Sequence, residues 1–197
     1  MRGFNYKKAV QALNYLAQKS GGALNKMKAI KLIWLADRLH LRTYGRTITG
    51  DVYFALPYGP VPSTTRDILE LNSFSLSEDE LSYSNEFIVI TDKFNYKTNK
   101  NSDTKVFSQT DLNAIQTIWE NYGACDQFKL SELSHQFPEW QKYESALNQK
   151  VASRFEMDYL DFFENIQDGS DLFIDDPSSI QLSKDIYLES QKISSIL

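Results

Sequence analysis

The sequence predicts a mainly α-helical domain with a small antiparallel β-hairpin or sheet (an α+β fold), built around one buried helix at about residues 25–44. Three observations predict this class. Segment 25–44 is apolar over most of its circumference when it is projected at about 100° per residue. Other amphipathic segments end at helix-stopping residues, whereas β-branched and aromatic runs are short. With 197 residues, 42% of them hydrophobic and 24% charged, the chain is long enough for one such core.

The first part of the chain predicts two helices followed by a strand. Apolar spacing predicts helices over 6–19 and 25–44, and Gly45 ends the second one. Residues 49–51 (Thr-Gly-Asp) predict a turn. Residues 52–56 are aromatic and β-branched enough to form a short strand.

A proline-rich segment follows this strand. Residues 57–62 read Pro-Tyr-Gly-Pro-Val-Pro, and each proline fixes its own φ and keeps the preceding residue out of helical space. We therefore expect an ordered extended loop. Ser63 then offers an N-cap for a short helix that ends near Leu71.

The middle of the chain predicts a hairpin. Residues 72–85 are rich in Ser, Glu and Asn, which predicts a surface connection. Strand signals at 87–91 and 105–107 predict a hairpin, with the polar residues 97–103 forming an exposed loop between them.

The last part of the chain predicts mostly helix. The elements expected there are a helix over 111–122 capped by Thr110, helices over 130–135 and 138–150, an amphipathic segment over 157–166, an acidic linker over 168–177 and a terminal helix over 180–197. This pattern predicts a domain over 1–167 and an acidic C-terminal extension over 168–197.

Composition narrows the class of protein. No apolar run in the sequence is long enough to cross a membrane. Cys125 is the only cysteine and no charged-then-apolar leader opens the chain, so we expect a cytoplasmic protein without a disulfide. One cysteine and two histidines are too few for a zinc site, and no glycine-rich phosphate loop occurs. We expect no metal, no cofactor and no membrane partner.

Charge is unevenly distributed along the chain. Residues 1–70 carry eleven Lys or Arg against four Asp or Glu, whereas residues 71–197 carry ten against twenty-two. The acidic part is expected to repel nucleic acid and to attract a basic partner. Two interpretations stay open: the acidic end binds a basic surface on another protein, or it docks on the basic half of its own chain.

The predicted central helix separates its cations from its apolar side chains. Lys28, Lys31, Arg38 and Arg42 fall within an arc of about 80°, and we interpret them as a solvated stripe. A phosphate or DNA contact is the alternative. Because no aromatic side chain lies within the arc and the chain is acidic overall, nucleic acid is not the expected partner.

Asp37 lies on the opposite, apolar side of this helix. A buried carboxylate without partners is very costly, so we expect Asp37 to brace the backbone amides of 59–61 or the hydroxyl of Tyr58. Catalysis is the alternative, with Asp37 and His135 sharing the pocket of a hydrolase. His135 itself is expected to pack beside Trp140.

Three segments resemble a known family. Residues 31–51 (KLIWLADRLHLRTYGRTITGD) resemble the opening motif of the Panacea domain, also called the SocA-like antitoxin domain. Residues 55–63 (ALPYGPVPS) look like its second signature, and 130–140 is similar to its later S-H … P-x-W segment. The residues that we expect to form the structural motif are Asp37, Arg38, Tyr44, Gly45, Gly50, Asp51, Tyr58, Gly59, Pro60, Val61, His135 and Trp140.

The resemblance, which covers about residues 5–165, implies an antitoxin of a bacterial or prophage toxin–antitoxin system. Such a protein neutralises a co-encoded protein toxin by direct binding and is not an enzyme. Its motifs fall on positions that we assign to core and loop, which fits a scaffold better than a catalytic site. The alternatives are an adaptor that delivers the toxin to a cytoplasmic protease, and the hydrolase described above. A homo-oligomer is also compatible with the sequence.

We expect the acidic C-terminal part to contact the toxin. Its carboxylates would face a basic toxin surface and speed association, and three apolar residues would anchor in a pocket. The residues of this expected contact are Asp158, Asp161, Glu164, Asp168, Asp171, Leu172, Phe173, Ile174, Asp175 and Asp176. In the competing interpretation, the same segment folds against the basic half of its own chain.

Overall fold

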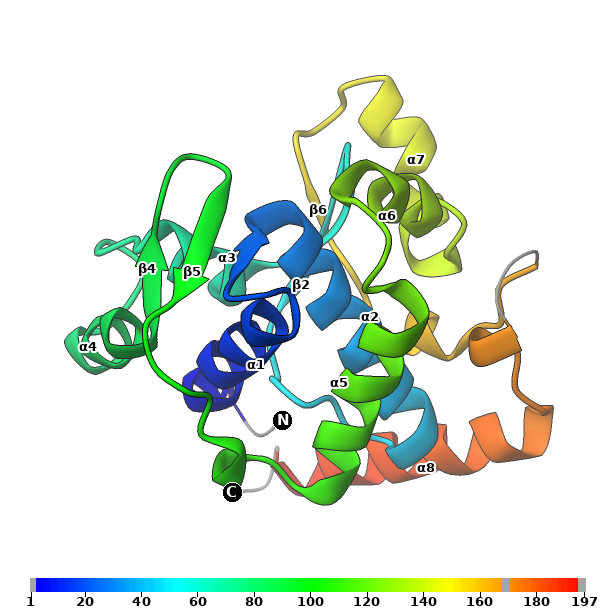
Figure 1. The fold of residues 1–197 in the computed structure, drawn as a ribbon. Coiled ribbons are helices and arrows are strands. Elements are labelled where there is room, and N and C mark those ends of the chain that lie inside the picture. Colours follow the sequence, from blue (N-terminus) through cyan, green and yellow to red (C-terminus); the bar gives the residue numbers. More distant parts are fainter. Residues whose placement is uncertain (1–2, 168–170, 195–197) are drawn as a thin grey trace.

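Helix α2 (Lys26–Tyr44) runs through the middle of the molecule, and most other elements pack against it (Figure 1). Asn25 caps its start by accepting a hydrogen bond from a backbone N–H, and Gly45 ends it in the left-handed conformation. Its side chains are buried on all sides, and both Leu32 and Trp34 are 0% exposed. The prediction of a mainly helical fold around this buried helix is confirmed.

The structure is a computed structural model that describes residues 3–167 and 171–194. The elements of these residues, where η marks a 3₁₀ helix, are α1 (Tyr6–Lys19), β1 (Ala23–Asn25), α2, β2 (Tyr53–Leu56), β3 (Gly59–Pro62), α3 (Ser63–Glu70), α4 (Glu78–Phe87), β4 (Ile88–Ile90), β5 (Asn95–Thr98), η1 (Thr104–Val106), α5 (Gln109–Tyr122), α6 (Gln127–Ser134), α7 (Pro138–Asn148), β6 (Phe155–Glu156), η2 (Tyr159–Phe163), η3 (Asp171–Phe173) and α8 (Pro177–Ser194). No helix in this part of the chain is both long enough and apolar enough to cross a membrane.

The other helices enclose α2. Helices α1, α5, α6 and α8 each pack against it, and α8 crosses its C-terminal end at the bottom of Figure 1. Leu13 of α1 and Ile118 of α5, both 0% exposed, are among the side chains that join α2 in one continuous core. Since α2 is surrounded by apolar packing, any charged group on it needs a partner inside the protein.

Two small antiparallel sheets flank the helices. The first has the strand order β1-β5-β4, and the second has the order β3-β2-β6. In the second sheet, Tyr53 lies opposite Pro62 and Leu56 lies opposite Gly59, so β2 and β3 form a tight hairpin.

The proline-rich segment 57–62 was predicted to be a loop, but most of it is strand β3. This strand lies at the edge of its sheet and pairs only with β2. An edge strand leaves every second N–H outside the ladder, so Pro60 and Pro62, which have no N–H, are tolerated there.

Two predictions for the middle of the chain are wrong. The expected surface connection over 72–85 contains most of α4, whose start carries a capping box between Ser77 and Glu80. The expected strand at 105–107 is instead the 3₁₀ turn η1, and β5 is the strand that pairs with β4. Asp92 closes that hairpin by accepting hydrogen bonds from two backbone N–H groups of the turn.

The C-terminal elements begin and end at other residues than predicted. Ser108, not Thr110, caps α5. The amphipathic segment 157–166 forms the short 3₁₀ helix η2, and the terminal helix α8 begins at Pro177. Residues 168–170 of the expected linker and 195–197 of the expected terminal helix lie outside the described residues. The division of the chain at residue 167 stays a prediction.

The end of α2 allows α8 to approach closely. Gly45 has φ +67, and a Cβ at this position would lie 2.7 Å from the backbone oxygen of Ser183 and 2.7 Å from the Ile186 side chain. Both groups belong to α8. A glycine is therefore needed at residue 45 for its backbone conformation and for the contact with α8.

We predict that Gly45→Ala destabilises the protein more than Gly21→Ala does. Both substitutions strain a left-handed backbone by about 1 to 2 kcal/mol. Only the first also inserts a methyl group into α8, since nothing lies within 4 Å of a Cβ at Gly21. Urea unfolding measures the two losses, and hydrogen exchange should show faster exchange in α8 for Gly45→Ala alone. Equal losses with unchanged exchange would contradict the described packing.

Candidate functional site

Asp37 is fully buried in the middle of α2 and accepts four hydrogen bonds. The N–H groups of Ile48 and Thr49 donate to Oδ1 over 2.7 and 3.1 Å, and the Tyr53 hydroxyl donates to Oδ2 over 2.8 Å. The Thr49 hydroxyl is the fourth donor. The helix projection predicted the burial correctly, but the predicted partners at 58–61 are wrong. The partners lie in the turn that follows α2 and at the start of β2.

The environment of Asp37 suits a bracing group. Burial raises the pKa of its carboxyl group to about 6, and the hydrogen bonds from Thr49, Tyr53 and the backbone oppose this rise. All four donors point toward carboxylate oxygens, which is the arrangement that an ionised carboxylate needs. At 0% exposure the group has no open route to a substrate. It holds the 48–49 turn and β2 against α2.

Asp51 is a second buried brace from the same motif. Its carboxylate accepts hydrogen bonds from the N–H groups of Val52, Thr64 and Thr65, the last over 2.7 Å. Burial raises the pKa of this carboxyl group, and its hydrogen bonds oppose the rise. Asp51 thus satisfies the free N–H groups at the start of α3. The predicted N-cap, Ser63, is instead the first residue of that helix.

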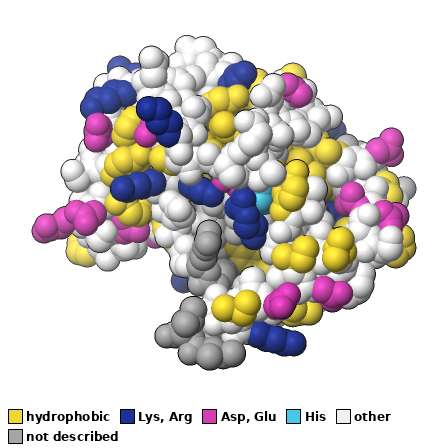
Figure 2. Space-filling model, turned by 90° about the horizontal axis from the view of Figure 1, so that it is seen from below, with side chains coloured by type: hydrophobic (Ala, Val, Ile, Leu, Met, Phe, Trp, Pro, Cys, Tyr) yellow, Lys and Arg dark blue, Asp and Glu magenta, His cyan; other side chains and the backbone are white. Residues whose placement is uncertain are grey.

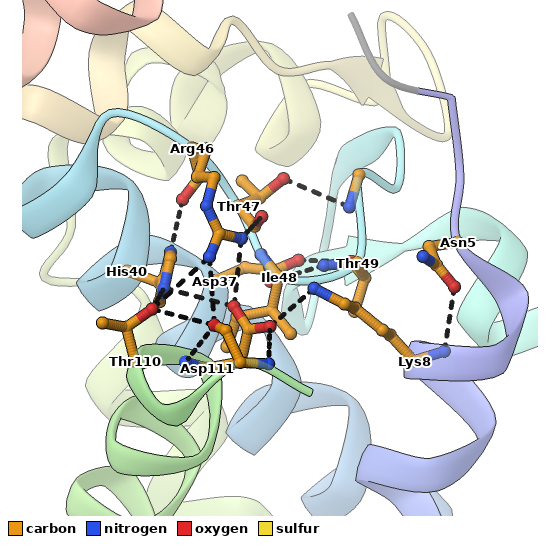
Figure 3. A network of polar contacts seen from close by, with 12 residues as sticks. Asn5, Lys8, Asp37, His40, Arg46, Thr47, Ile48, Thr49, Thr110 and Asp111 are labelled. Carbon is orange, nitrogen blue, oxygen red and sulfur yellow. Dashed lines mark hydrogen bonds and ion pairs between the residues drawn. The ribbon is translucent and has the colours of Figure 1, made fainter. Parts of the chain in front are cut away.

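A network around Asp111 lies beside these braces (Figure 3). Asp111 of α5 pairs with Lys8 Nζ over 2.5 Å and with Arg46 Nη1 over 3.0 Å. Burial raises the pKa of Asp111, but the hydrogen bonds from Lys8 and Ser108 and the nearby cations outweigh it, so the net change is downward. Burial also lowers the pKa of His40 to about 4, which leaves this histidine neutral at neutral pH. The network joins α1, α2 and α5.

The predicted solvated stripe on α2 is wrong for three of its four cations. Lys31 is 1%, Arg38 0% and Arg42 3% exposed. Arg38 Nε donates to Glu139 Oε1 over 2.8 Å, and Arg38 Nη2 donates to the Glu164 carbonyl oxygen over 2.7 Å. Arg38 and Arg42 look solvent-facing in the sequence because the partners that cover them lie more than 100 residues further along the chain.

Arg42 fastens the C-terminal segment to α2. Its guanidinium group donates to the carboxylate of Asp175 over 2.7 Å and to the side chain of Asn165. It also reaches the backbone oxygens of Phe162 and Phe173. Burial lowers the pKa of Arg42 to about 10, so the group keeps its charge at neutral pH. For this segment, the structure favours docking on the chain's own basic half.

This docking buries one residue of the expected toxin contact and pairs another within the chain. Phe173 is 0% exposed, and the centroid of its ring lies 5.1 Å from the Arg38 guanidinium carbon. It is therefore not available as an anchor for another protein. Asp175 is paired with Arg42. Asp161 pairs with Lys142 near the surface. Other predicted contact residues are exposed, namely Asp158, Glu164, Asp171, Ile174 and Asp176, whereas Leu172 is half-buried and Asp168 lies outside the described residues.

The second and third motif blocks pack against each other. A Cβ at Gly59, which has φ +96, would overlap the Ser134 hydroxyl of α6. Lys31 Nζ donates to the Pro60 carbonyl oxygen over 2.9 Å, and Trp140 Nε1 donates to the Leu56 carbonyl oxygen over 2.8 Å. The β2–β3 hairpin is therefore held between α2, α6 and α7.

His135 packs against Trp140 and is separate from Asp37. The two rings stack with centroids 3.8 Å apart, and burial lowers the pKa of His135. The described hydrogen bonds of Asp37 include none to His135, and neither residue lines the cavity of about 710 Å³ between the 45–50 turn and α8. Among residues 3–167 and 171–194, no group of three or more His, Cys, Asp and Glu side chains is arranged to hold a metal ion.

Glu139 and Asp111 are two buried acceptors that the sequence did not reveal. Both are 0% exposed; Glu139 accepts from the buried Arg38 of α2, and Asp111 pairs with the partly exposed Lys8 and Arg46. Glu139 lies inside the predicted P-x-W block, but spacing alone does not connect it to Arg38, since the two residues are 101 positions apart. Asp111 has the local signal of a capping box with Ser108.

The fold and these contacts define a mainly helical domain whose motif residues brace one central helix. The family model described as "Antitoxin SocA-like, Panacea domain" matches residues 30–141, which include the three blocks of the motif. That match covers more than half of the chain, and the protein belongs to this family of antitoxin domains. Comparisons with curated proteins and with solved structures each found no match.

We predict that Asp37→Ala lowers the free energy of unfolding by about 3 kcal/mol or more, because each buried donor without an acceptor costs about 1 to 3 kcal/mol. Asp92→Ala is the matched control, since Asp92 also accepts backbone N–H groups but is exposed, and only a small change is expected. Denaturant unfolding measures both. A loss no larger for Asp37→Ala than for Asp92→Ala would contradict the bracing role.

We predict that Lys31 makes stability depend on pH. Burial lowers its pKa from 10.5 to about 7, so between these values the unfolded chain binds a proton that the folded chain does not. The contribution of Lys31 to the free energy of unfolding is therefore fully present above pH 10.5, and it is lost as the pH falls to about 7. Lys31→Met should gain several kcal/mol over wild type at pH 7 and lose that advantage toward pH 10, since a tenfold change in proton affinity is worth about 1.4 kcal/mol.

Urea unfolding from pH 7 to 10 measures this difference, with Lys19→Met, a substitution of an exposed lysine, as the control. The stability of the Lys19→Met variant should follow that of the wild type at every pH. If the difference in unfolding free energy between Lys31→Met and wild type did not change with pH, a lowered pKa of Lys31 would be contradicted.

Proposed function

We propose that this protein is an antitoxin that inactivates a protein toxin encoded by a neighbouring gene, by binding it directly in the cytoplasm. Membership of the antitoxin domain family supports the general role. The proposal adds the mode of action, which is contact between two folded proteins without a chemical reaction.

One observation carries the direct-binding mechanism: the charged residues of the motif are used inside the protein. Asp37, Asp51 and Arg38 are each 0% exposed, and each has its own hydrogen-bond partners. A catalytic group needs access to its substrate, which these groups lack. The same contacts make a rigid scaffold, and such a scaffold supports recognition by the residues on its outside.

The exposed acidic residues indicate what kind of toxin the protein would bind. Asp158, Glu164, Asp171 and Asp176 are exposed in the C-terminal part of the chain. A toxin with a basic surface would be attracted to them, and complementary charge mainly raises the rate of association. We therefore propose a basic protein toxin as the partner and do not propose nucleic acid.

Co-expression with the product of the neighbouring reading frame tests the function. We predict that this product alone arrests growth and that the intact chain restores it, whereas a gene with a stop codon at Tyr6 does not. The purified proteins should also form a complex in size-exclusion chromatography. Failure of the intact chain to restore growth would exclude the antitoxin role for this gene pair.

The same assay separates binding from delivery to a protease. Direct neutralisation predicts rescue that persists in strains without individual cytoplasmic proteases, and toxin that stays at its normal level. Rescue that disappears in one such strain, with toxin that is otherwise degraded, would replace direct neutralisation by the adaptor mechanism.

A further inference from the structure

Helix α8 carries a line of exposed aliphatic side chains. Leu182 is 63%, Ile186 45% and Ile193 56% exposed. Their spacing of four and seven residues places them within about 40° of one another around the helix. Single exposed aliphatic residues are ordinary on protein surfaces, but a row of them marks an interaction site more often.

The fold does not need this row to hold α8 in place. The helix is fastened by a different face, where Ser183 is 4% exposed and the ring of Tyr187 lies 6.1 Å from that of Tyr159 and 5.9 Å from that of Phe163. Ile186 belongs to the exposed row and also helps to hold α8 in place, because its side chain packs against Gly45. Leu182 and Ile193 therefore remain available to another molecule.

Acidic side chains border the row. Asp185 and Glu189 are exposed on α8 itself, and Asp176 is exposed at its start, so these carboxylates outnumber Lys192, the exposed lysine on the same side of the helix. Figure 2, which views the molecule from below, shows several apolar and acidic side chains and one basic side chain close together on the face that α8 occupies. A partner that covers the row also covers these carboxylates, so its own surface has to supply basic groups around an apolar groove.

A second copy of this chain fits the row poorly. A two-fold interface brings the same patch of both copies together, so two patches of the same negative net charge would meet, since Asp176, Asp185 and Glu189 outnumber Lys192. Three partly exposed aliphatic side chains also supply only a fraction of the roughly 800 Å² per partner that a stable interface buries. A different, basic protein meets both requirements, because it pairs with the carboxylates and widens the buried area.

We propose that α8 is the toxin-docking helix of this antitoxin: it lays the row Leu182–Ile186–Ile193 into an apolar groove of the toxin that is bordered by Lys and Arg side chains. This inference rests on the proposed antitoxin function and adds the surface that carries it. The binding mode is that of an amphipathic helix in a groove, where residues about one turn apart act as anchors.

Binding measurements with two variants test the docking surface. The probe is the purified product of the neighbouring reading frame, inactivated by substitution so that it can be produced. Leu182→Ser with Ile193→Ser should weaken its binding at least 30-fold, mostly through faster dissociation. Asp185→Lys with Glu189→Lys should slow association and flatten its dependence on salt. Phe74→Ser with Phe94→Ser, at two exposed apolar residues outside α8, is the matched control and should bind like wild type.

The outcomes separate this inference from the proposed function. If wild type binds the toxin and both α8 variants bind equally well, the docking surface is wrong and the antitoxin function stands. If wild type neither binds nor restores growth, both are wrong. A wild-type dimer that Leu182→Ser with Ile193→Ser dissociates, without any change in toxin binding, would assign the row to self-association and overturn the inference. Because the changed side chains are exposed, thermal melting should show that all variants stay folded.

Discussion

The four hydrogen bonds onto the Asp37 carboxylate are the constraint on which the rest of the architecture depends. They join the middle of α2 to the Ile48–Thr49 turn and to Tyr53 at the start of β2. Because the chain leaves that turn in a fixed direction, Asp51 lies where it can receive the N–H groups at the start of α3. A charge buried in the central helix thus sets the positions of the elements that follow it. Its cost of desolvation is offset only when all of these elements are in place.

The buried cations of α2 organise the other half of the molecule in the same way. Arg38 binds Glu139 and the Glu164 carbonyl oxygen, and Arg42 holds Phe162, Asn165 and Asp175 against the helix. Acidic and basic residues of the motif therefore both hold other segments of the chain against α2, the carboxylates by accepting hydrogen bonds and the guanidinium groups by donating them. The interior of the domain is therefore held together by these polar contacts as well as by its apolar core.

Local signals explain which parts of the fold could be predicted. The helices over 6–19 and 25–44 follow from apolar spacing and from Gly45, because these signals act within one or two turns. The capping box at Ser77 was equally local and was overlooked. The partner of Arg38 was not predictable, because a charged residue on a helix is identical in sequence whether solvent or a segment 101 residues away covers it. For Asp37 the burial was predictable, but the choice of partner depended on how the chain turns after Gly45.

The contacts of Arg42 with Phe162, Asn165 and Asp175 have a consequence for the synthesis of the protein. During translation, Arg38 and Arg42 are synthesised long before the residues whose backbone oxygens and carboxylate accept their hydrogen bonds. A nascent or prematurely terminated chain therefore carries unneutralised cations at the centre of its longest helix and does not close its core. Incompletely folded chains of this kind are the ones on which cellular proteases act. Folding of the region around α2 thus depends on residues that lie more than 100 positions after its arginines.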